Sequence, residues 1–356
     1  MNPLRSAILN CRKTLSMGRT LATAVVMAAV LPVFINYAKG SEPMSLLHKK
    51  PLYSVKVKAF GANYTILVND ISILIETDPR GQIATTLPVN HWMRSGENTV
   101  SILVFPDEKG EPFRPNFYVS IALIVHEHSD PEKEYTVATL VFDGKKDEDG
   151  SHTAQSSPSG VYASDKDFEP HPSGDVEVFD VVATPRDGYD GALTVERTIN
   201  IPSSLPLWAF FTSDEIPDYE AIFYSKGRDE YEKAFESLYN EYKKIQNAIA
   251  NKDIESILPM FDERNRETDL AFYREPGTTA AGMREALMEA AHDPDRELVN
   301  LRLSSAGPLV EGNSRVVSLR RSGFDPAIIL NFIEGIGSER FPMYFRLQDG
   351  QWILTR

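Results

Sequence analysis

Cysteine is almost absent from this sequence of 356 residues, because Cys11 is the one example. It lies ahead of a long apolar run, so the remainder of the chain contains no thiol. Disulfide bonds, a thiol nucleophile and cysteine-ligated zinc are therefore excluded for that remainder. A lipoprotein cysteine would have to follow the apolar run, so Cys11 does not have that role either.

Acidic residues are also missing from the first 41 positions, which carry basic residues before an apolar run at 21–38. This order is typical of an export signal in residues 1–40. The run reaches the lower limit for crossing a bilayer, so a cleaved signal peptide and an uncleaved inner-membrane anchor both remain open. An exported body without disulfide bonds favours a bacterial periplasmic or secreted protein.

The familiar catalytic motifs are absent as well. The sequence contains no glycine-rich phosphate loop, no His-Glu-x-x-His zinc motif and no Gly-x-Ser-x-Gly elbow. No repeat of solenoid length is visible. The sequence therefore names no reaction and predicts no cofactor, and a noncatalytic role is favoured.

What the chain does contain is an excess of acid, 51 Asp and Glu against 37 Lys and Arg, for a net charge of −14. Because every acidic residue follows the basic leader, the body is more acidic than the whole. Such a body repels nucleic acid and anionic lipid and would attract a basic protein partner. The length and the 42% hydrophobic content suffice for two cores, so we expect two domains.

Residues 50–213 have the period-two pattern of β-strands. Tyr53, Val55 and Val57 alternate with polar residues, and an Asn-Asp pair at 69 and 70 separates two β-branched runs, which predicts a hairpin. Similar runs recur as far as about residue 213. The pattern predicts an all-β sandwich or jelly roll.

One stretch carries a resemblance: "ILVNDISI" followed by "TTLPVNHWMRSGENTVSILVFP" is similar to galactose-binding-like jelly-roll modules. Gly96 and Asn98 would supply a tight turn, residues 100, 102 and 104 would point into the core, and Trp92 or Met93 would pack the approach. Asp70 departs from the family pattern, which has glycine at this point of the hairpin. An immunoglobulin-like sandwich would produce a similar strand pattern.

Two kinds of site are candidates in this half. The resemblance implies the first, since modules of this type often bind sugars, which stack on exposed aromatic rings, and the candidates are Trp92, Tyr118 and Tyr135. Independently of the resemblance, His126 and His128 lie two apart at a strand end and could begin a metal site, although a solvated strand end is the favoured explanation.

A polar stretch rich in Ser, Gly and charge, residues 143–175, predicts a long loop. Asp147 and Asp149 are spaced as in a calcium loop, but Lys145 and Ser156 stand where two essential carboxylates belong. Calcium binding is therefore excluded there, and a partner-contacting loop is the functional alternative.

Residues 220–356 change to a helical period. Apolar residues at 231, 235, 238, 242, 245 and 249 predict one helix from about 227 to 250. "NKDIESILPMF" predicts a shorter helix, and "TTAAGMREALMEAAHD" a third, with Thr278 or Thr279 as its cap. Four strand-like runs follow, ending in a hairpin at Asp349 and Gly350. This order predicts an α+β domain with helices on one side of an antiparallel sheet.

"YKKIQNAIANKDIESILPMFDE" and the closing "FRLQDGQWILTR" resemble the nuclear-transport-factor-2-like (cystatin-like) fold, which wraps a cone-shaped antiparallel sheet around a long helix. Members of that family that are enzymes place an acid or base in the cone. The resemblance makes Asp269, Tyr273, Arg320 and Trp352 candidate ligand-binding residues, although a core role for Tyr273 and a solvated strand end for Arg320 are the alternatives. A cone plugged by Phe272, Phe345 and Trp352 would exclude such a site.

Three functions follow from these observations. The first is an exported, noncatalytic envelope protein that binds another protein, for example an immunity or inhibitor protein of the periplasm. The second is a carbohydrate-binding accessory protein that uses the jelly-roll half. The third is a small-molecule-binding protein or enzyme that uses the C-terminal cone. The first is preferred, because no catalytic set is evident.

Overall fold

The computed structural model describes most of the chain from Lys50 onward. The described residues are 50–61, 63–77, 81–108, 111, 113–144, 177–185, 191–201, 205–321, 324–334 and 337–356. The leader, the apolar run at 21–38 and nearly all of the long polar loop lie outside them. Among the described residues, no helix is both long and apolar enough to cross a membrane.

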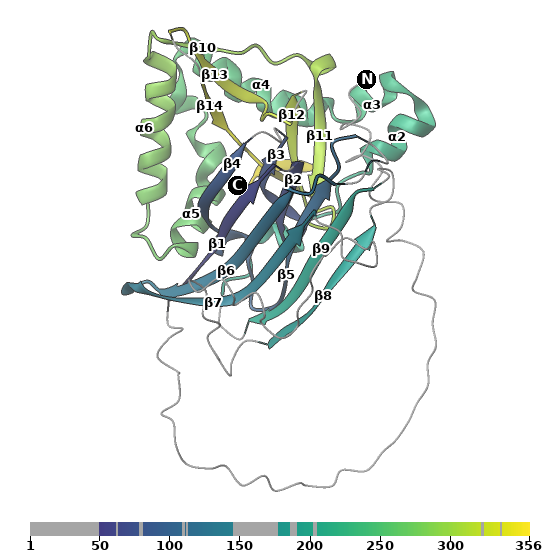
Figure 1. Ribbon diagram of the computed structural model, residues 1–356. Helices are drawn as coiled ribbons and strands as arrows, with labels where there is room; N and C mark the ends of the chain where they lie inside the picture. The colour runs from purple at the N-terminus through teal and green to yellow at the C-terminus, as the bar shows by residue number, and fades with distance from the viewer. Residues whose placement is uncertain are drawn as a thin grey trace, which may run out of the picture.

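The N-terminal part is a sandwich of two antiparallel sheets, drawn in purple to teal in Figure 1. The first sheet has the order β4-β1-β6-β7, formed by Gln82–Pro88, Pro51–Phe60, Tyr118–Glu127 and Asp130–Asp143. The second has the order β3-β2-β5-β9-β8, formed by Ile71–Glu76, Asn63–Val68, Gly96–Phe105, Leu193–Ile201 and Glu177–Pro185. The prediction of a β-rich N-terminal half is confirmed.

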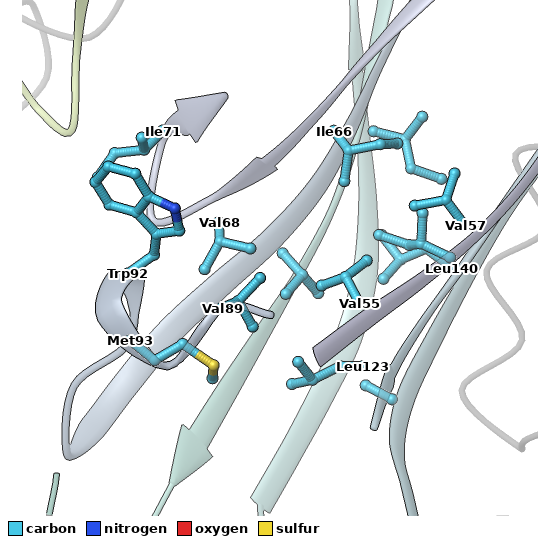
Figure 2. Packing of buried hydrophobic residues seen from close by; sticks show 14 of the residues in the cluster. Val55, Val57, Ile66, Val68, Ile71, Val89, Trp92, Met93, Leu123 and Leu140 are labelled. Atoms are coloured by element: carbon cyan, nitrogen blue, oxygen red, sulfur yellow. The ribbon is translucent and has the colours of Figure 1, made fainter. Parts of the chain in front are cut away.

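The sandwich core lies between the two sheets, as the period-two pattern requires. Tyr53, Val55 and Val57 of β1 are buried, and they face residues 100, 102 and 104 of β5 within one apolar cluster. Figure 2 shows Trp92 and Met93 closing one end of this cluster near Val68 and Val89. The inward direction predicted for these residues is confirmed, while β5 is buried on both faces from Val100 to Phe105.

Two turns of the sandwich have backbone conformations that suit the residues found there. Asn69 and Asp70 both adopt positive φ, 52° and 61°, and join Val68 to Ile71 in the predicted hairpin. Gly96 has φ 82°. Asn98 is buried and its amide donates to the carbonyls of Arg94 and Gly96 at 2.8 and 2.9 Å. Both predicted turns are confirmed, because asparagine and glycine tolerate this backbone and asparagine bonds its own turn.

The C-terminal part is α+β. Its helices are α2 (Tyr219–Lys226), α3 (Arg228–Ala234), α4 (Glu236–Asn251), α5 (Asp262–Ala271) and α6 (Thr278–His292). One of its sheets has the order β10-β13-β14, formed by Arg296–Leu298, Ile328–Phe332 and Ser338–Phe341. The other has the order β11-β12-β15-β16, formed by Ala306–Glu311, Val316–Arg321, Phe345–Gln348 and Gln351–Leu354. The coarse prediction of helices followed by antiparallel strands is confirmed.

The predicted helix from 227 to 250 is broken, which corrects the sequence interpretation. Its apolar face is buried as expected, but α3 ends before Phe235 and α4 begins after it. Phe235 lies edge-on to Tyr219 of α2 and Tyr231 of α3, with ring centroids 6.2 and 5.0 Å away. This aromatic cluster holds α2, α3 and α4 together, and hydrophobic periodicity does not sense such a contact.

Two further helix predictions need correction. The segment 251–261 forms two short 3₁₀ turns, η5 (Ile254–Ser256) and η6 (Leu258–Phe261), because Pro259 has no amide hydrogen to continue an α-helix. The cap of α6 is neither Thr278 nor Thr279. The carboxylate of Asp269 takes that role instead, accepting the amides of Gly277 and Thr279 at 2.8 and 2.9 Å.

Strand β12 is buried on both faces, which places the second C-terminal sheet between two cores. Val317 and Leu319 pack on the helices with Tyr242 and Phe345. Val316, on the opposite face, belongs to the sandwich core. The two parts of the molecule therefore share a packed boundary, called here the interface.

Candidate functional site

The interface gathers several ionisable groups whose pKa values are shifted by burial. From the sandwich it takes η2 (Asn90–Trp92) and the β2–β3 turn, and from the C-terminal part α5, β11, β12 and the final residues. Ala271, Val316 and Tyr344 are buried in the same apolar cluster as the sandwich core. Polar groups brought here lose water, so each needs a partner within the protein.

Asn90 joins the two parts through its side chain. It is fully buried, and its amide donates to the carbonyls of Pro51 in β1 and Ala271 in α5 at 2.7 and 2.8 Å. The backbone carbonyl of Asn90 accepts the indole N–H of Trp208 at 3.1 Å. One residue thus satisfies backbone groups of both parts.

Arg356 lies in a cage of aromatic rings at the interface. Its guanidinium carbon is 5.5 Å from the ring centroids of Trp92 and Trp208 and 4.9 Å from that of Phe210. Its Nη1 donates to Glu267 Oε2 at 2.6 Å. Burial lowers the pKa of Arg356 although Glu267 acts to raise it. The pair is a buried ion pair supported by cation–π contacts.

His91 lies beside this cage, with further basic groups around it. Its carbonyl accepts Arg356 Nε at 3.0 Å, and its ring is 5.3 Å from that of Phe272. Arg274 stacks over Phe272 at 5.3 Å. Burial, followed by the charges of Arg356, Arg264 and Arg274, holds the pKa of His91 well below its usual value. The imidazole is therefore neutral at neutral pH.

A second charged cluster surrounds Glu311 on β11. Its Oε1 accepts the Ser72 amide at 3.0 Å and also the Ser72 hydroxyl. Tyr344 Oη donates to the Ser72 carbonyl at 3.0 Å and accepts Arg320 Nη2 at 2.8 Å. Burial raises the pKa of Glu311, which Arg320 and Ser72 offset in part.

The β2–β3 turn completes the interface. The Asp70 carbonyl accepts the Gly312 amide at 2.8 Å, and its carboxylate accepts the Asn313 amide at 3.1 Å. Asp70 is the position at which the chain departs from the jelly-roll pattern. The departure coincides with a contact between the two parts.

The predicted ligand-binding candidates in the C-terminal part have separate neighbours. Asp269 caps α6; burial would raise the pKa of its carboxylate, but hydrogen bonds from Thr279 and Gly277 hold it below its usual value. Tyr273 donates to the Pro51 carbonyl at 3.3 Å and faces the sandwich. Trp352 donates to Ser237 Oγ at 3.0 Å. The structure does not bring these groups around one space.

Arg320 is not at a solvated strand end, which corrects the sequence interpretation. Its Nε donates to Ser318 at 3.0 Å, and its Nη2 donates to Tyr344 within the C-terminal part, at the interface. The space expected for a cone is occupied by Phe345, which is fully buried against Tyr242 at 5.0 Å. Tyr242 Oη donates to the Met343 carbonyl and accepts the Leu319 amide, so this hydroxyl is already engaged twice.

The aromatic candidates for sugar binding do not form one platform. Trp92 is buried, with Phe210 and Tyr344 edge-on at 5.8 and 5.3 Å, so it offers no open face to a sugar. Tyr118 and Tyr135 are half-buried on β6 and β7. Tyr135 pairs with Val125, roughly 20 Å along the strand from Tyr118.

The two histidines proposed for a metal site have different neighbours. His126 is the penultimate residue of β6, and its Nδ1 is 3.1 Å from the Glu127 carbonyl. His128 lies in the following turn with its ring 5.9 Å from that of Tyr273. In the part of the chain that the structure describes, no three His, Cys, Asp or Glu side chains are grouped to hold a metal ion.

The residues that dominate the interface were not predicted from the sequence, namely Asn90, His91, Glu267, Glu311 and Arg356. One signal pointed toward the interface, the aspartate at position 70 of the predicted hairpin. The burial of the five residues depends on partners far away in sequence, about which apolar periodicity carries no information.

No protein-family model, no curated protein and no solved structure matches this chain. The residues of the interface themselves therefore define its chemistry. It holds neutral imidazole, guanidinium and carboxylate groups in fixed positions. The Ser72 hydroxyl donates to the Glu311 carboxylate, but both side chains are buried.

Proposed function

We propose that the chain is an exported, noncatalytic envelope protein that acts by binding another protein, and that this partner is basic. A periplasmic immunity or inhibitor protein is the concrete form of this proposal. The observation that carries it is an exposed apolar pair with an acidic rim on the small sheet β10-β13-β14.

This surface, the β13 patch, consists of Phe332 and Ile333 with Asp295, Glu297 and Glu334. The two apolar side chains are 40% and 61% exposed and adjacent in sequence. The three acidic residues are exposed. Ile333 donates its amide to the Asp295 carbonyl at 2.8 Å, and Glu297 pairs with Asn331 in the β10–β13 ladder, so the rim is held next to the pair.

The basic side chain that stacks on the patch, Arg296, already contacts carboxylates. Arg296 stacks over Phe332 at 5.8 Å, but its guanidinium contacts the carboxylates of Glu289, Asp293 and Glu339. The patch therefore presents an apolar centre in a negative field. That combination supports a basic protein partner, since apolar contact supplies affinity and charge speeds association.

The finer fold assignments belong to the same proposal. We assign the sandwich to the galactose-binding-like jelly rolls and the C-terminal part to the nuclear-transport-factor-2-like fold. Support for the first comes from the two-sheet arrangement and the Gly96 turn; support for the second comes from helices that precede antiparallel strands. A fold does not fix a function, so the binding proposal rests on the β13 patch.

The proposal is tested by affinity purification of the full tagged chain from its native envelope, with matched surface variants. Ile333→Ser removes the apolar centre of the patch. Leu207→Ser is the control, because Leu207 is exposed to the same degree, 62%, on a different part of the surface. Losing one buried aliphatic side chain costs about 1.5–3 kcal/mol, so we expect binding at least roughly tenfold weaker for Ile333→Ser alone.

Two results would contradict the proposal. The first is that no stoichiometric protein is recovered with the wild type. The second is that the recovered protein is acidic, or is held equally well by Ile333→Ser and Leu207→Ser. Either result would leave the β13 patch without a role in binding a basic partner.

A further inference from the structure

A cluster of three guanidinium groups and one imidazole lies at the interface of a protein whose net charge is −14. The cluster consists of His91, Arg264, Arg274 and Arg356. The guanidinium of Arg356 is deeply buried, Arg264 and His91 are partly buried, and Arg274 is exposed. The cluster therefore runs from the interior to the surface.

Contacts define how these groups are held together. Arg264 and Glu267 lie one turn apart on α5, and Glu267 binds Arg356 Nη1. Arg356 in turn donates to the His91 carbonyl, and the His91 and Arg274 side chains lie against the same Phe272 ring. Burial and then the charges of Arg356 and Arg274 lower the pKa of Arg264 to about 10.

Several donors of the cluster have no acceptor in the described residues. Arg356 Nη2 and His91 Nδ1 are buried atoms without a hydrogen-bond partner. Arg264 donates to Asn265, its neighbour in sequence, and its guanidinium makes no other hydrogen bond within the described part of the chain. Buried donors normally have hydrogen-bond partners. Arg356 Nη2, His91 Nδ1 and the Arg264 guanidinium therefore point to an acceptor outside the protein.

The carboxylates nearby are already engaged. Glu267 accepts the Ala209 amide through Oε1 and Arg356 through Oε2. Glu263 binds Arg346 through both oxygens, at 2.8 and 2.6 Å. The positive charge of Arg264 is thus left without a carboxylate, a costly arrangement in a partly buried site.

We propose that this cluster is a binding site for one small oxyanion, a carboxylate or a phosphate group, at the interface between the two parts. Arg264 and Arg356 Nη2 donate to the anion, and the neutral imidazole donates through Nδ1. Arg274 marks the side from which the ligand enters. The site is separate from the β13 patch, so the inference does not depend on a protein partner.

The chemical class follows from the donors. Guanidinium groups match the oxygen spacing of carboxylate and phosphate and bind them through paired hydrogen bonds. A neutral imidazole adds a donor without adding charge. Binding of an anion would also stabilise the protonated form of His91, because an opposite charge would then lie beside it.

The test uses the full chain and two probes, inorganic phosphate and succinate, titrated by isothermal calorimetry at constant ionic strength. We expect the wild type to bind one equivalent of at least one probe, and the tighter probe identifies the class. Arg264→Gln should weaken that binding at least tenfold. Arg266→Gln, which removes the same charge from an exposed position on the same helix, should leave it unchanged.

Thermal unfolding with and without the probe tests the proposed site even where a variant changes the stability of the protein. Saturating probe should raise the Tm of the wild type and of Arg266→Gln, and should leave that of Arg264→Gln nearly unchanged. Titration of His91 by NMR should show its pKa rising when the probe is bound. The inference is overturned if neither probe binds, or if Arg264→Gln binds and responds as the wild type does.

Discussion

Two Arg–Glu pairs in this protein differ mainly in burial. Arg356 and Glu267 lie 2.6 Å apart with side chains 3% and 8% exposed. Arg284 and Glu255 lie 2.6 Å apart with side chains 53% and 60% exposed. Water screens the second pair, whereas the first pair has lost its water and depends on its partner.

We therefore expect Glu267→Ala to lower the free energy of unfolding by about 3–5 kcal/mol, because it leaves Arg356 charged and unpaired inside the aromatic cage. The matched change Glu255→Ala should cost about 1 kcal/mol or less. Urea unfolding of the two variants measures both values. Equal losses would show that the cage itself, without the carboxylate, is enough to hold the guanidinium.

At the scale of single residues, the sequence predicted the sandwich core well and the interface poorly. Val55, Val57 and Trp92 are apolar at alternating or turn positions, and their burial follows from pattern alone. Asn90 and Glu267 are buried because of partners far away in sequence, Ala271 and Arg356 respectively. Such pairings depend on tertiary structure, so no local pattern reveals them.

At the scale of elements, helix α5 is another feature that local sequence patterns do not reveal. Residues 262–271 carry no apolar stripe and were predicted to lie between helices. The structure buries three polar side chains of this helix, Asn265, Glu267 and Asp269, which at a spacing of two do not share one face. Hydrophobic periodicity does not reveal such a helix, whereas it predicted the apolar helix α6 that follows.

Asp269 links two elements, since it belongs to α5 and caps α6. Its pKa lies below its usual value in the folded protein, so its stabilising effect is present above the unfolded pKa of about 3.9 and is lost as pH falls through the folded value. We expect Asp269→Asn to cost about 1–2 kcal/mol at pH 7 and to lose less stability than the wild type on acidification to pH 3.

Urea unfolding at both pH values checks this expectation. Asp218→Asn is the control, because Asp218 is an exposed cap that accepts the Ala221 amide at 2.9 Å at the start of α2. The control should keep most of the acid dependence of the wild type. An acid dependence in Asp269→Asn as steep as that of the wild type would contradict the assignment of Asp269 as the cap carboxylate.

At the scale of the whole molecule, the interface joins the sandwich and the C-terminal part through backbone and side chains alike. The β2–β3 turn binds Gly312 and Asn313, Asn90 binds Ala271, and Tyr344 binds Ser72. The two parts shown in Figure 1 therefore have a common boundary core, and neither should open without exposing apolar surface of the other.

We expect Asn90→Ala to destabilise both parts together, by about 2–4 kcal/mol, because the Ala271 carbonyl loses its side-chain donor and the Pro51 carbonyl keeps only the longer bond from Tyr273. Hydrogen exchange followed by mass spectrometry measures this for each element. Amides of β5 in the sandwich and of α4 in the C-terminal part should lose protection by similar factors. Ser225→Ala, which removes an exposed hydroxyl bond within α2, serves as the control and should change neither element. If β5 loses protection while α4 keeps it, the two parts unfold independently and the interface contacts contribute little to coupling them.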